Sequence, residues 1–233
     1  METSFKGPLI VEFNGLPGSG KTTLANLLKS KLDLQGHKTF LRYYKHSFPY
    51  RHYCTLFLPH YYRLIYLINQ YSHSFSTRKS LIRKLSIVNY VKMYIDFVSN
   101  NKSGILIIDQ GILQSIVSLA FDELFPDNDK LIAILQECGI GDLPLVIVNC
   151  SVPLAISEER IEKRGPKSSG FRLDSLDVEK RVNVLETESV NFETIRCLIG
   201  SSLSNVMIEN LDLENNIEHN LDLLLKLVSN TEK

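Results

Sequence analysis

The residues whose spacing suggests chemistry most directly form one glycine-rich segment, Gly15-Leu16-Pro17-Gly18-Ser19-Gly20-Lys21-Thr22. Its fixed positions fit the pattern GxxxxGK[ST]. Glycines let a backbone wrap tightly with its N–H groups pointing inward, so that several donors can converge on one anion. The segment is therefore predicted to hold a chain of phosphates, with Lys21 on the β- and γ-phosphates and the Thr22 hydroxyl on Mg²⁺.

The neighbouring sequence supplies the elements that such a loop requires. An apolar run at 9–13 reads as a buried strand, and apolar residues at helical spacing follow over 22–34. The positive end of that helix dipole favours a bound phosphate. The strand, loop and helix together are those of a P-loop, and we expect Thr23 to join the eight loop residues in contacting the nucleotide.

A carboxylate is predicted beside the loop. Asp109 ends the apolar run 105–108, which is typical of a central strand. In a parallel sheet the carboxyl end of such a strand lies beside the phosphate site, where Asp109 can bind Mg²⁺ with Thr22 and can also act in catalysis. The alternative is an aspartate that caps the next helix.

Two arginines further along the chain suggest a lid over about 153–172. Arg160 and Arg164 are four residues apart and share a helix face, and the flexible stretch 165–170 follows them. Guanidinium groups delivered by a lid can stabilise charge on a transferred phosphoryl group. The alternative is a solvated face whose cations pair with the acidic residues of the same helix, Glu158, Glu159 and Glu162.

The acceptor of that group is expected to bind in the region 40–100, whose first half is rich in tyrosine, histidine and arginine. Aromatic rings stack on other rings, and arginine holds anions. The candidate acceptor-binding residues are Arg42, Tyr44, Arg51, Gln110 and Arg172. An aromatic helix packed on the core explains the same composition. Glu12, in the first strand, is a weaker candidate for reaching the acceptor.

Strands that alternate with helices predict an α/β fold with a parallel sheet covered on both faces, in a single domain 1–233. The expected strands are 9–13, 39–43, 105–109, 145–150 and 206–208. The expected helices are 22–34, about 60–71, 78–98, one from Leu113, 130–138, 153–164, 176–198 and about 213–228.

Charge and cysteine content narrow the function classes. Lys+Arg and Asp+Glu balance at 26 each, so there is no long-range attraction to nucleic acid or to an anionic membrane. The four cysteines form no CxxC pair, and the N-terminus has no signal-peptide pattern. A cytoplasmic protein with free thiols is the expectation, and the apolar stretch 53–68 is too short to cross a membrane.

The order of P-loop, strand ending in Asp109, basic lid and final helix resembles the thymidylate kinase-like branch of the P-loop nucleoside and nucleotide kinases. The resemblance implies a three-layer P-loop NTPase fold with a five-stranded parallel sheet, ATP as donor with Mg²⁺, and an adenine-binding loop near 210–213, including Asn210 and Leu211. Gln110 stands where thymidylate kinases typically have arginine, and Pro17 where they have an acidic residue. Both departures count against dTMP as acceptor. The segment 15–23 also resembles that of poorly characterised bacterial P-loop kinases, a resemblance that leaves open another acceptor altogether.

Three functions fit these patterns. The main prediction is an ATP-dependent phosphotransferase acting on a nucleotide, a nucleoside or a similar small molecule. The first alternative is a regulatory NTPase that works through a protein partner, although the NKxD motif of GTPases is absent. The second is an antibiotic or sugar kinase, which would share the donor site. A homodimer through the apolar helix 78–98 is possible, but burial of that helix in its own core explains it equally well.

Overall fold

The computed structural model describes residues 7–43, 61–71, 78–120, 127–164, 176–203, 206–213 and 216–231. Three predicted acceptor residues, Tyr44, Arg51 and Arg172, lie outside these ranges, as does the loop 165–170. The backbone of Arg164 is described, but its side chain is not.

The core of the protein is a parallel five-stranded sheet in the order β2-β3-β1-β4-β5. This confirms the predicted α/β fold with a five-stranded parallel sheet. The order places β1 in the centre, with β3 and β4 as its neighbours, so the loops after β1 and β3 lie side by side at one edge. The strands are β1 (Leu9–Asn14), β2 (Thr39–Tyr43), β3 (Ile105–Asp109), β4 (Leu145–Ser151) and β5 (Met207–Asp212).

Helices connect the strands at the predicted places, with ends that differ from the predicted ones by a few residues. Apolar residues at helical spacing define most of them, and Asp127 and Asp177 cap two of them by accepting from backbone N–H groups. The helices are α1 (Lys21–Leu34), α2 (Tyr62–Tyr71), α3 (Arg78–Asn100), α4 (Ile112–Ala120), α5 (Asn128–Glu137), α6 (Leu154–Arg164), α7 (Val178–Ser202) and α8 (Ile217–Thr231).

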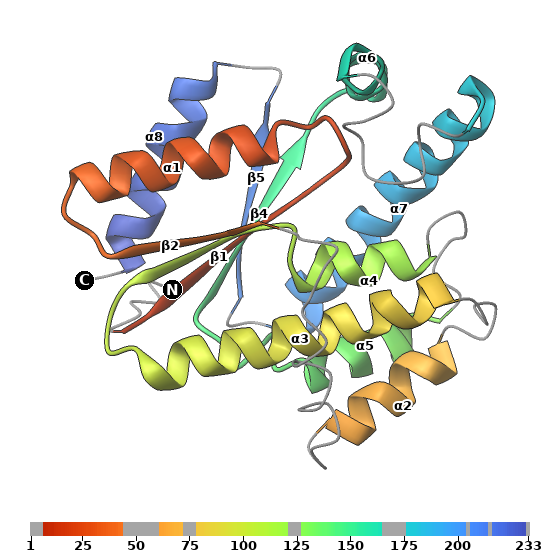
Figure 1. The fold of residues 1–233 in the computed structure, drawn as a ribbon, viewed down its shortest axis with the longest axis horizontal. Helices are drawn as coiled ribbons and strands as arrows, with labels where there is room; N and C mark the ends of the chain where they lie inside the picture. Colours follow the sequence, from red (N-terminus) through yellow and green to blue (C-terminus); the bar gives the residue numbers. More distant parts are fainter. Residues whose placement is uncertain are drawn as a thin grey trace.

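The helices form layers on both faces of the sheet (Figure 1). Helices α1 and α8 cover one face, and α3, α4, α5 and α7 cover the other, where α2 packs against α3 and α5. Alternate residues of β1 therefore enter different clusters: Leu9, Val11 and Phe13 pack under α1, and Ile10 packs with α3 and α4. Glu12 and Asn14 share the side of Ile10, and their polar groups face that second layer.

Two details of the predicted elements were wrong. The last strand continues to Asp212 instead of ending at residue 208, since β5 is an edge strand whose polar residues Glu209 and Asn210 conceal its continuation in the sequence. The apolar spacing of 78–98 predicts Ile95 on the buried face of that helix, but Ile95 is 45% exposed, and Tyr94 takes the buried position beside it. The buried stripe of α3 belongs to the main core cluster, as the second explanation of its apolar pattern required. A homodimer stays a prediction.

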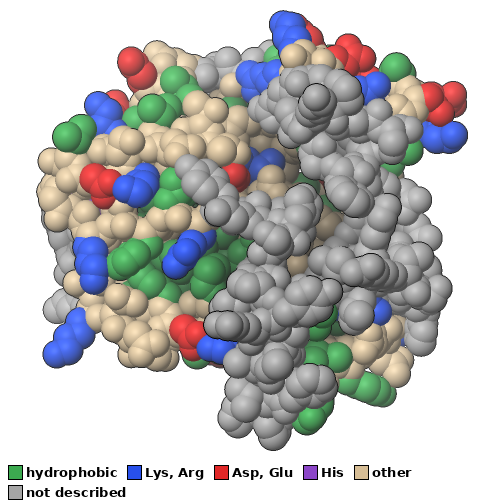
Figure 2. Space-filling model, in the orientation of Figure 1, with side chains coloured by type: hydrophobic (Ala, Val, Ile, Leu, Met, Phe, Trp, Pro, Cys, Tyr) green, Lys and Arg blue, Asp and Glu red, His purple; other side chains and the backbone are tan. Residues whose placement is uncertain are grey.

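The described surface in Figure 2 carries basic and acidic side chains interspersed, with no large patch of one sign. This agrees with a sequence of zero net charge. Among the described residues, none of the helices is both long enough and apolar enough to span a membrane.

Candidate functional site

The loop between β1 and α1 has the shape that the glycine pattern predicts. Gly15, Gly18 and Gly20 have φ angles of 138°, 82° and 92°, in the region that favours glycine. At Gly15 the backbone also passes very close to β4, since a Cβ atom there would lie 2.2 Å from the carbonyl oxygen of Cys150. A side chain at residue 15 would push the loop away from the sheet, so the position requires glycine.

The N-terminus of α1 opens onto this loop. Its capping residue is Gly20, which has no side chain and so makes no side-chain cap. The first N–H groups of a helix have no partner within the helix, and together with the helix dipole they favour a bound anion. The end of α1 is thus suited to phosphate oxygens, and their binding there stays a prediction.

Lys21 turns back over the loop. It is only 4% exposed, and its Nζ donates to the carbonyl oxygens of Gly15 and Leu16, both at 2.7 Å, and to the Ser19 hydroxyl at 3.3 Å. These bonds hold the ammonium group inside the ring of loop backbone. The cation is therefore already at the place where phosphate charge would enter.

Thr22 and Asp109 meet across the sheet edge, although they are far apart in the sequence. The Thr22 hydroxyl donates to Asp109 Oδ2 at 2.6 Å. Asp109 is 5% exposed, and its other oxygen, Oδ1, has no hydrogen-bond partner among the described residues. Buried polar oxygens are normally paired. An unpaired carboxylate oxygen beside a hydroxyl is suited to a hard cation.

These donors fit Mg²⁺. The described residues contain no group of three or more His, Cys, Asp or Glu side chains that could hold a metal alone. Magnesium needs no such group, because it is commonly bound by one or two protein oxygens together with water and substrate phosphates. Thr22 and Asp109 are the side chains that would hold it here.

Helix α6 is attached to the outside of the loop. The Ser157 hydroxyl donates to the carbonyl oxygen of Pro17, and Arg160 Nη1 donates to that of Gly18 at 3.1 Å. The Arg160 guanidinium thus lies at the rim of the loop, close to the predicted phosphate site. Its contact with transferred phosphate stays a prediction, and so does that of Arg164. Ser157 was missed from the sequence because a lone serine in a polar helix gives no signal.

The other predicted site residues lie at several places. Gln110 directly follows Asp109 and has a φ of 69°. Arg42 is an exposed residue of β2 and pairs in register with Ile108. Asn210 and Leu211 lie within β5 rather than in a loop after it, and the Leu211 side chain is buried in the core under α1 and α8. The location expected for these two residues was therefore wrong, and any contact with adenine would have to involve their backbone or Asn210.

Glu12 does not face an acceptor site. It is fully buried, its Oε1 accepts from the N–H of Leu113 at 2.8 Å, and its Oε2 accepts from the Tyr94 hydroxyl at 2.6 Å. Burial raises the pKa of the Glu12 carboxyl, and hydrogen bonds from Tyr94 and from the backbone of Leu113 and Ile112 offset part of that rise. The suggestion that Glu12 reaches the acceptor was wrong, because its oxygens are already used inside the protein.

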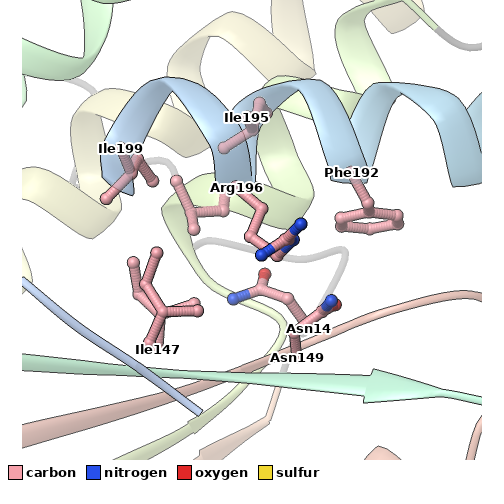
Figure 3. Close-up of a pocket in the computed structure, with 9 residues that line it drawn as sticks. Asn14, Ile147, Asn149, Phe192, Ile195, Arg196 and Ile199 are labelled. Atoms are coloured by element: carbon pink, nitrogen blue, oxygen red, sulfur yellow. The ribbon is translucent and has the colours of Figure 1, made fainter. Parts of the chain in front are cut away.

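A small cavity lies beneath α7, beside the last residue of β1 (Figure 3). Asn14, Asn149 and Arg196 provide its polar wall, and isoleucines of β4, β5 and α7 provide much of the rest. Neither amide atom of Asn14 has a hydrogen-bond partner among the described residues. The space is about that of a single water molecule.

Comparisons with known proteins show which solved structures share this fold, but they assign the chain to no family. No family model and no curated protein matches the sequence. Among the solved structures that match are those of deoxyadenosine kinase from M. mycoides. The structure with bound dATP has a TM-score of 0.55 at 15% identity, covering 95% of this chain and 99% of that one. The structure with bound dCTP has a TM-score of 0.52 at 14% identity, with the same coverage. At such identity the similarity supports the shared architecture.

Proposed function

We propose that this protein is an ATP-dependent kinase that transfers a phosphoryl group to a hydroxyl group of a nucleoside, a nucleotide or a similar small molecule. The observation that carries the proposal is the unpaired Oδ1 of Asp109, which lies beside Thr22 at the open end of α1. A glycine-rich turn without a ligand would have no use for a buried carboxylate oxygen at this place.

The residues of the loop divide the work of holding ATP. The backbone N–H groups of the loop, to which Pro17 contributes none, and the N-terminus of α1 bind the phosphate oxygens, and Lys21 neutralises charge on the β- and γ-phosphates. Thr22 and Asp109 hold Mg²⁺, which when bound supplies further charge stabilisation on the phosphates. Arg160, anchored at Gly18, and Arg164 are the lid residues that would stabilise the group in transfer.

The transfer exchanges one oxygen–phosphorus bond for another. The acceptor oxygen bonds to the γ-phosphorus, the bond from that phosphorus to the β,γ-bridging oxygen breaks, and ADP leaves with the electron pair. The proton of the acceptor hydroxyl must pass to a base, and Asp109, which the sequence predicts to act in catalysis, is the candidate for that base. Because phosphoryl transfer depends mainly on positioning and charge, a weak base is sufficient.

A deoxyribonucleoside is the acceptor class to test first. Two of the solved structures similar to this chain are of a deoxyadenosine kinase, with bound dATP and with bound dCTP, and each match covers 95% of this chain. Arg42, Gln110 and the predicted residues Tyr44, Arg51 and Arg172 are the candidates for acceptor contacts. Gln110 in place of the arginine of thymidylate kinases favours an acceptor without a phosphate in that position.

Label transfer from γ-labelled ATP tests this function. The protein is incubated with Mg²⁺ and with separate panels of deoxyribonucleosides, ribonucleosides, nucleoside monophosphates and sugars, and the products are separated. The proposal predicts label on members of one panel and ADP release that depends on that acceptor. ADP release at one rate with every panel and with none would contradict it and would favour the regulatory NTPase. Label on a sugar alone would favour the sugar kinase.

A further inference from the structure

The proposed reaction does not use the carboxyl group of Glu12. This group is fully buried in the central strand β1, and its burial costs free energy. Removing a carboxylate from water is unfavourable unless hydrogen bonds replace the lost solvation. Here the replacements come from two other elements: the backbone of Leu113 and Ile112 at the start of α4, and the hydroxyl of Tyr94 in α3. A residue of β1 therefore caps a helix that begins about a hundred residues later.

The start of α4 is fitted closely around this carboxyl. Gly111 directly precedes α4, and a Cβ atom built there would lie 2.2 Å from the Tyr94 hydroxyl and 2.5 Å from Glu12 Cδ. Such distances leave no space for any side chain at residue 111. The contact between Glu12, Tyr94 and Gly111 thus fixes the position of the first turn of α4 relative to the sheet.

The turn between β3 and α4 is short and strained. Gln110, with a φ of 69°, is the one non-glycine residue with positive φ among those described. A left-handed conformation costs a residue with a side chain roughly 1–2 kcal/mol and persists only where the surroundings impose it. On one side, Asp109 is held by the sheet and by Thr22. On the other side, the chain is held by Glu12 at Leu113.

We infer that Glu12 and Tyr94 are positioning residues of the magnesium site: by holding the first turn of α4, they keep Gln110 in its strained conformation and so keep Asp109 directed at Thr22. The inference rests on the proposed function, since it assigns these two residues to the site that binds Mg²⁺ and ATP. Released from Glu12, the turn can relax at Gln110, and the Asp109 carboxylate loses its fixed direction. Neither Glu12 nor Tyr94 touches the nucleotide.

The test separates metal-dependent from metal-independent binding of the nucleotide. Calorimetry measures the affinity for ATP in EDTA and then over a series of Mg²⁺ concentrations. Glu12→Met removes the acceptor oxygens at nearly constant volume, Glu12→Gln keeps one acceptor for Leu113, and Tyr94→Phe removes one donor. Val228→Ala, a truncation in the core under α8 on the opposite face, is the control for a general loss of stability.

We expect Glu12→Met to raise the Mg²⁺ concentration for half-maximal effect by about 10-fold or more, in line with other outer partners of metal ligands. Glu12→Gln should stay within about 3-fold of wild type, Tyr94→Phe should lie between the two variants, and all should bind ATP in EDTA as wild type does. Val228→Ala should lower the melting temperature without moving the Mg²⁺ dependence. A wild-type Mg²⁺ dependence in Glu12→Met, or an equal loss in EDTA, would overturn the inference.

Two further outcomes are also decisive. If Glu12→Met does not fold, Tyr94→Phe decides, and a shift below about 2-fold would overturn the inference. If wild type binds no ATP under either condition, the proposed function fails. If Mg²⁺ strengthens the binding of ATP by wild type and the variants show the same Mg²⁺ dependence, this inference fails and the proposed function stands.

Discussion

Two helices start side by side at the carboxyl edge of the sheet, and they meet the same physical need in opposite ways. Helix α1 follows β1 through a six-residue glycine-rich loop, and its first N–H groups have no side-chain cap. Helix α4 follows the neighbouring strand β3 through Gln110 and Gly111, and its first N–H groups donate to Glu12. Both ends offer donors and positive dipole.

The comparison shows how one sheet edge can contain both an open and a closed site. At α4 the hydrogen-bond acceptor is the protein's own Glu12 carboxyl, whose burial costs free energy, and the start of the helix is held in place. At α1 the proposed hydrogen-bond acceptor is a phosphate of the bound nucleotide, and Lys21 holds the loop in the conformation that would receive it. Asp109 connects the two, because it ends the strand before α4 and accepts from Thr22 in α1.

The largest expected effect comes from removing the cation, Lys21, from the loop at the N-terminus of α1. Lys21→Ala removes the ammonium group that lies against the carbonyl oxygens of Gly15 and Leu16. We expect the rate of acceptor-dependent ADP release to fall by on the order of 10² or more, as for other preorganised charge contacts. Lys29→Ala, in the same helix but paired with Asp33 at the surface, should keep wild-type rates. Full activity in Lys21→Ala would refute the site.

An intermediate effect is expected from adding a side chain at the N-terminus of α4, where Glu12 accepts from the backbone. Gly111→Ala places a methyl group against Glu12 and Tyr94, and overpacking of this kind costs about 1–3 kcal/mol. Gly200→Ala is the matched control, because it is the same change within α7 with no atom near the new methyl group, and it should add about 0.5–1 kcal/mol to stability. Urea unfolding measures both. Equal effects of the two changes would show that the start of α4 is loosely packed.

The smallest effect is a dependence of stability on pH that Glu12 should produce. Because the folded pKa of Glu12 is raised above 4.5, the folded protein binds its proton more tightly than the unfolded chain does. The contribution of Glu12 to stability is therefore complete below about 4.5 and is lost as the pH rises through the folded pKa. We expect wild type to lose stability relative to Glu12→Gln over that window.

Urea unfolding of wild type and Glu12→Gln at a series of pH values from about 4.5 to 8 measures this difference. The two other titratable groups that face Glu12 are Tyr94 and Cys138, and burial raises both of their pKa values, away from the window. They should not contribute to the drift. A constant difference across the series would show that the burial of Glu12 is fully offset by its hydrogen bonds.

The open site could be predicted from the sequence because its signals are local. The apolar run at 9–13, the glycines and Lys21-Thr22 follow one another without a break, and Asp109 ends an equally clear strand. That the strands are parallel follows from their alternation with helices, but the order of the strands in the sheet was not predicted. These features can be recognised without knowing which distant residues touch, so the fold class and the pairing of Thr22 with Asp109 at one site were both expected.

The closed site could not be predicted, since each of its contacts joins residues distant in the sequence. Glu12 bonds to Leu113 and Tyr94 across 101 and 82 positions. Two signals were present: a charged residue in the middle of a buried strand, and a glycine two residues after Asp109. Neither names its partner. In β5 the polar residues Glu209 and Asn210 hid an edge strand, because only a central strand must be apolar throughout.

The attachment of α6 to the loop has a consequence for how the protein can change over time. Ser157 and Arg160 bind carbonyl oxygens of residues 17 and 18, which every amino acid provides. The side chain of residue 17 can thus be exchanged without disturbing the grip of α6 on that stretch of backbone. Residue 17 can therefore vary over evolution while α6 stays attached to the loop.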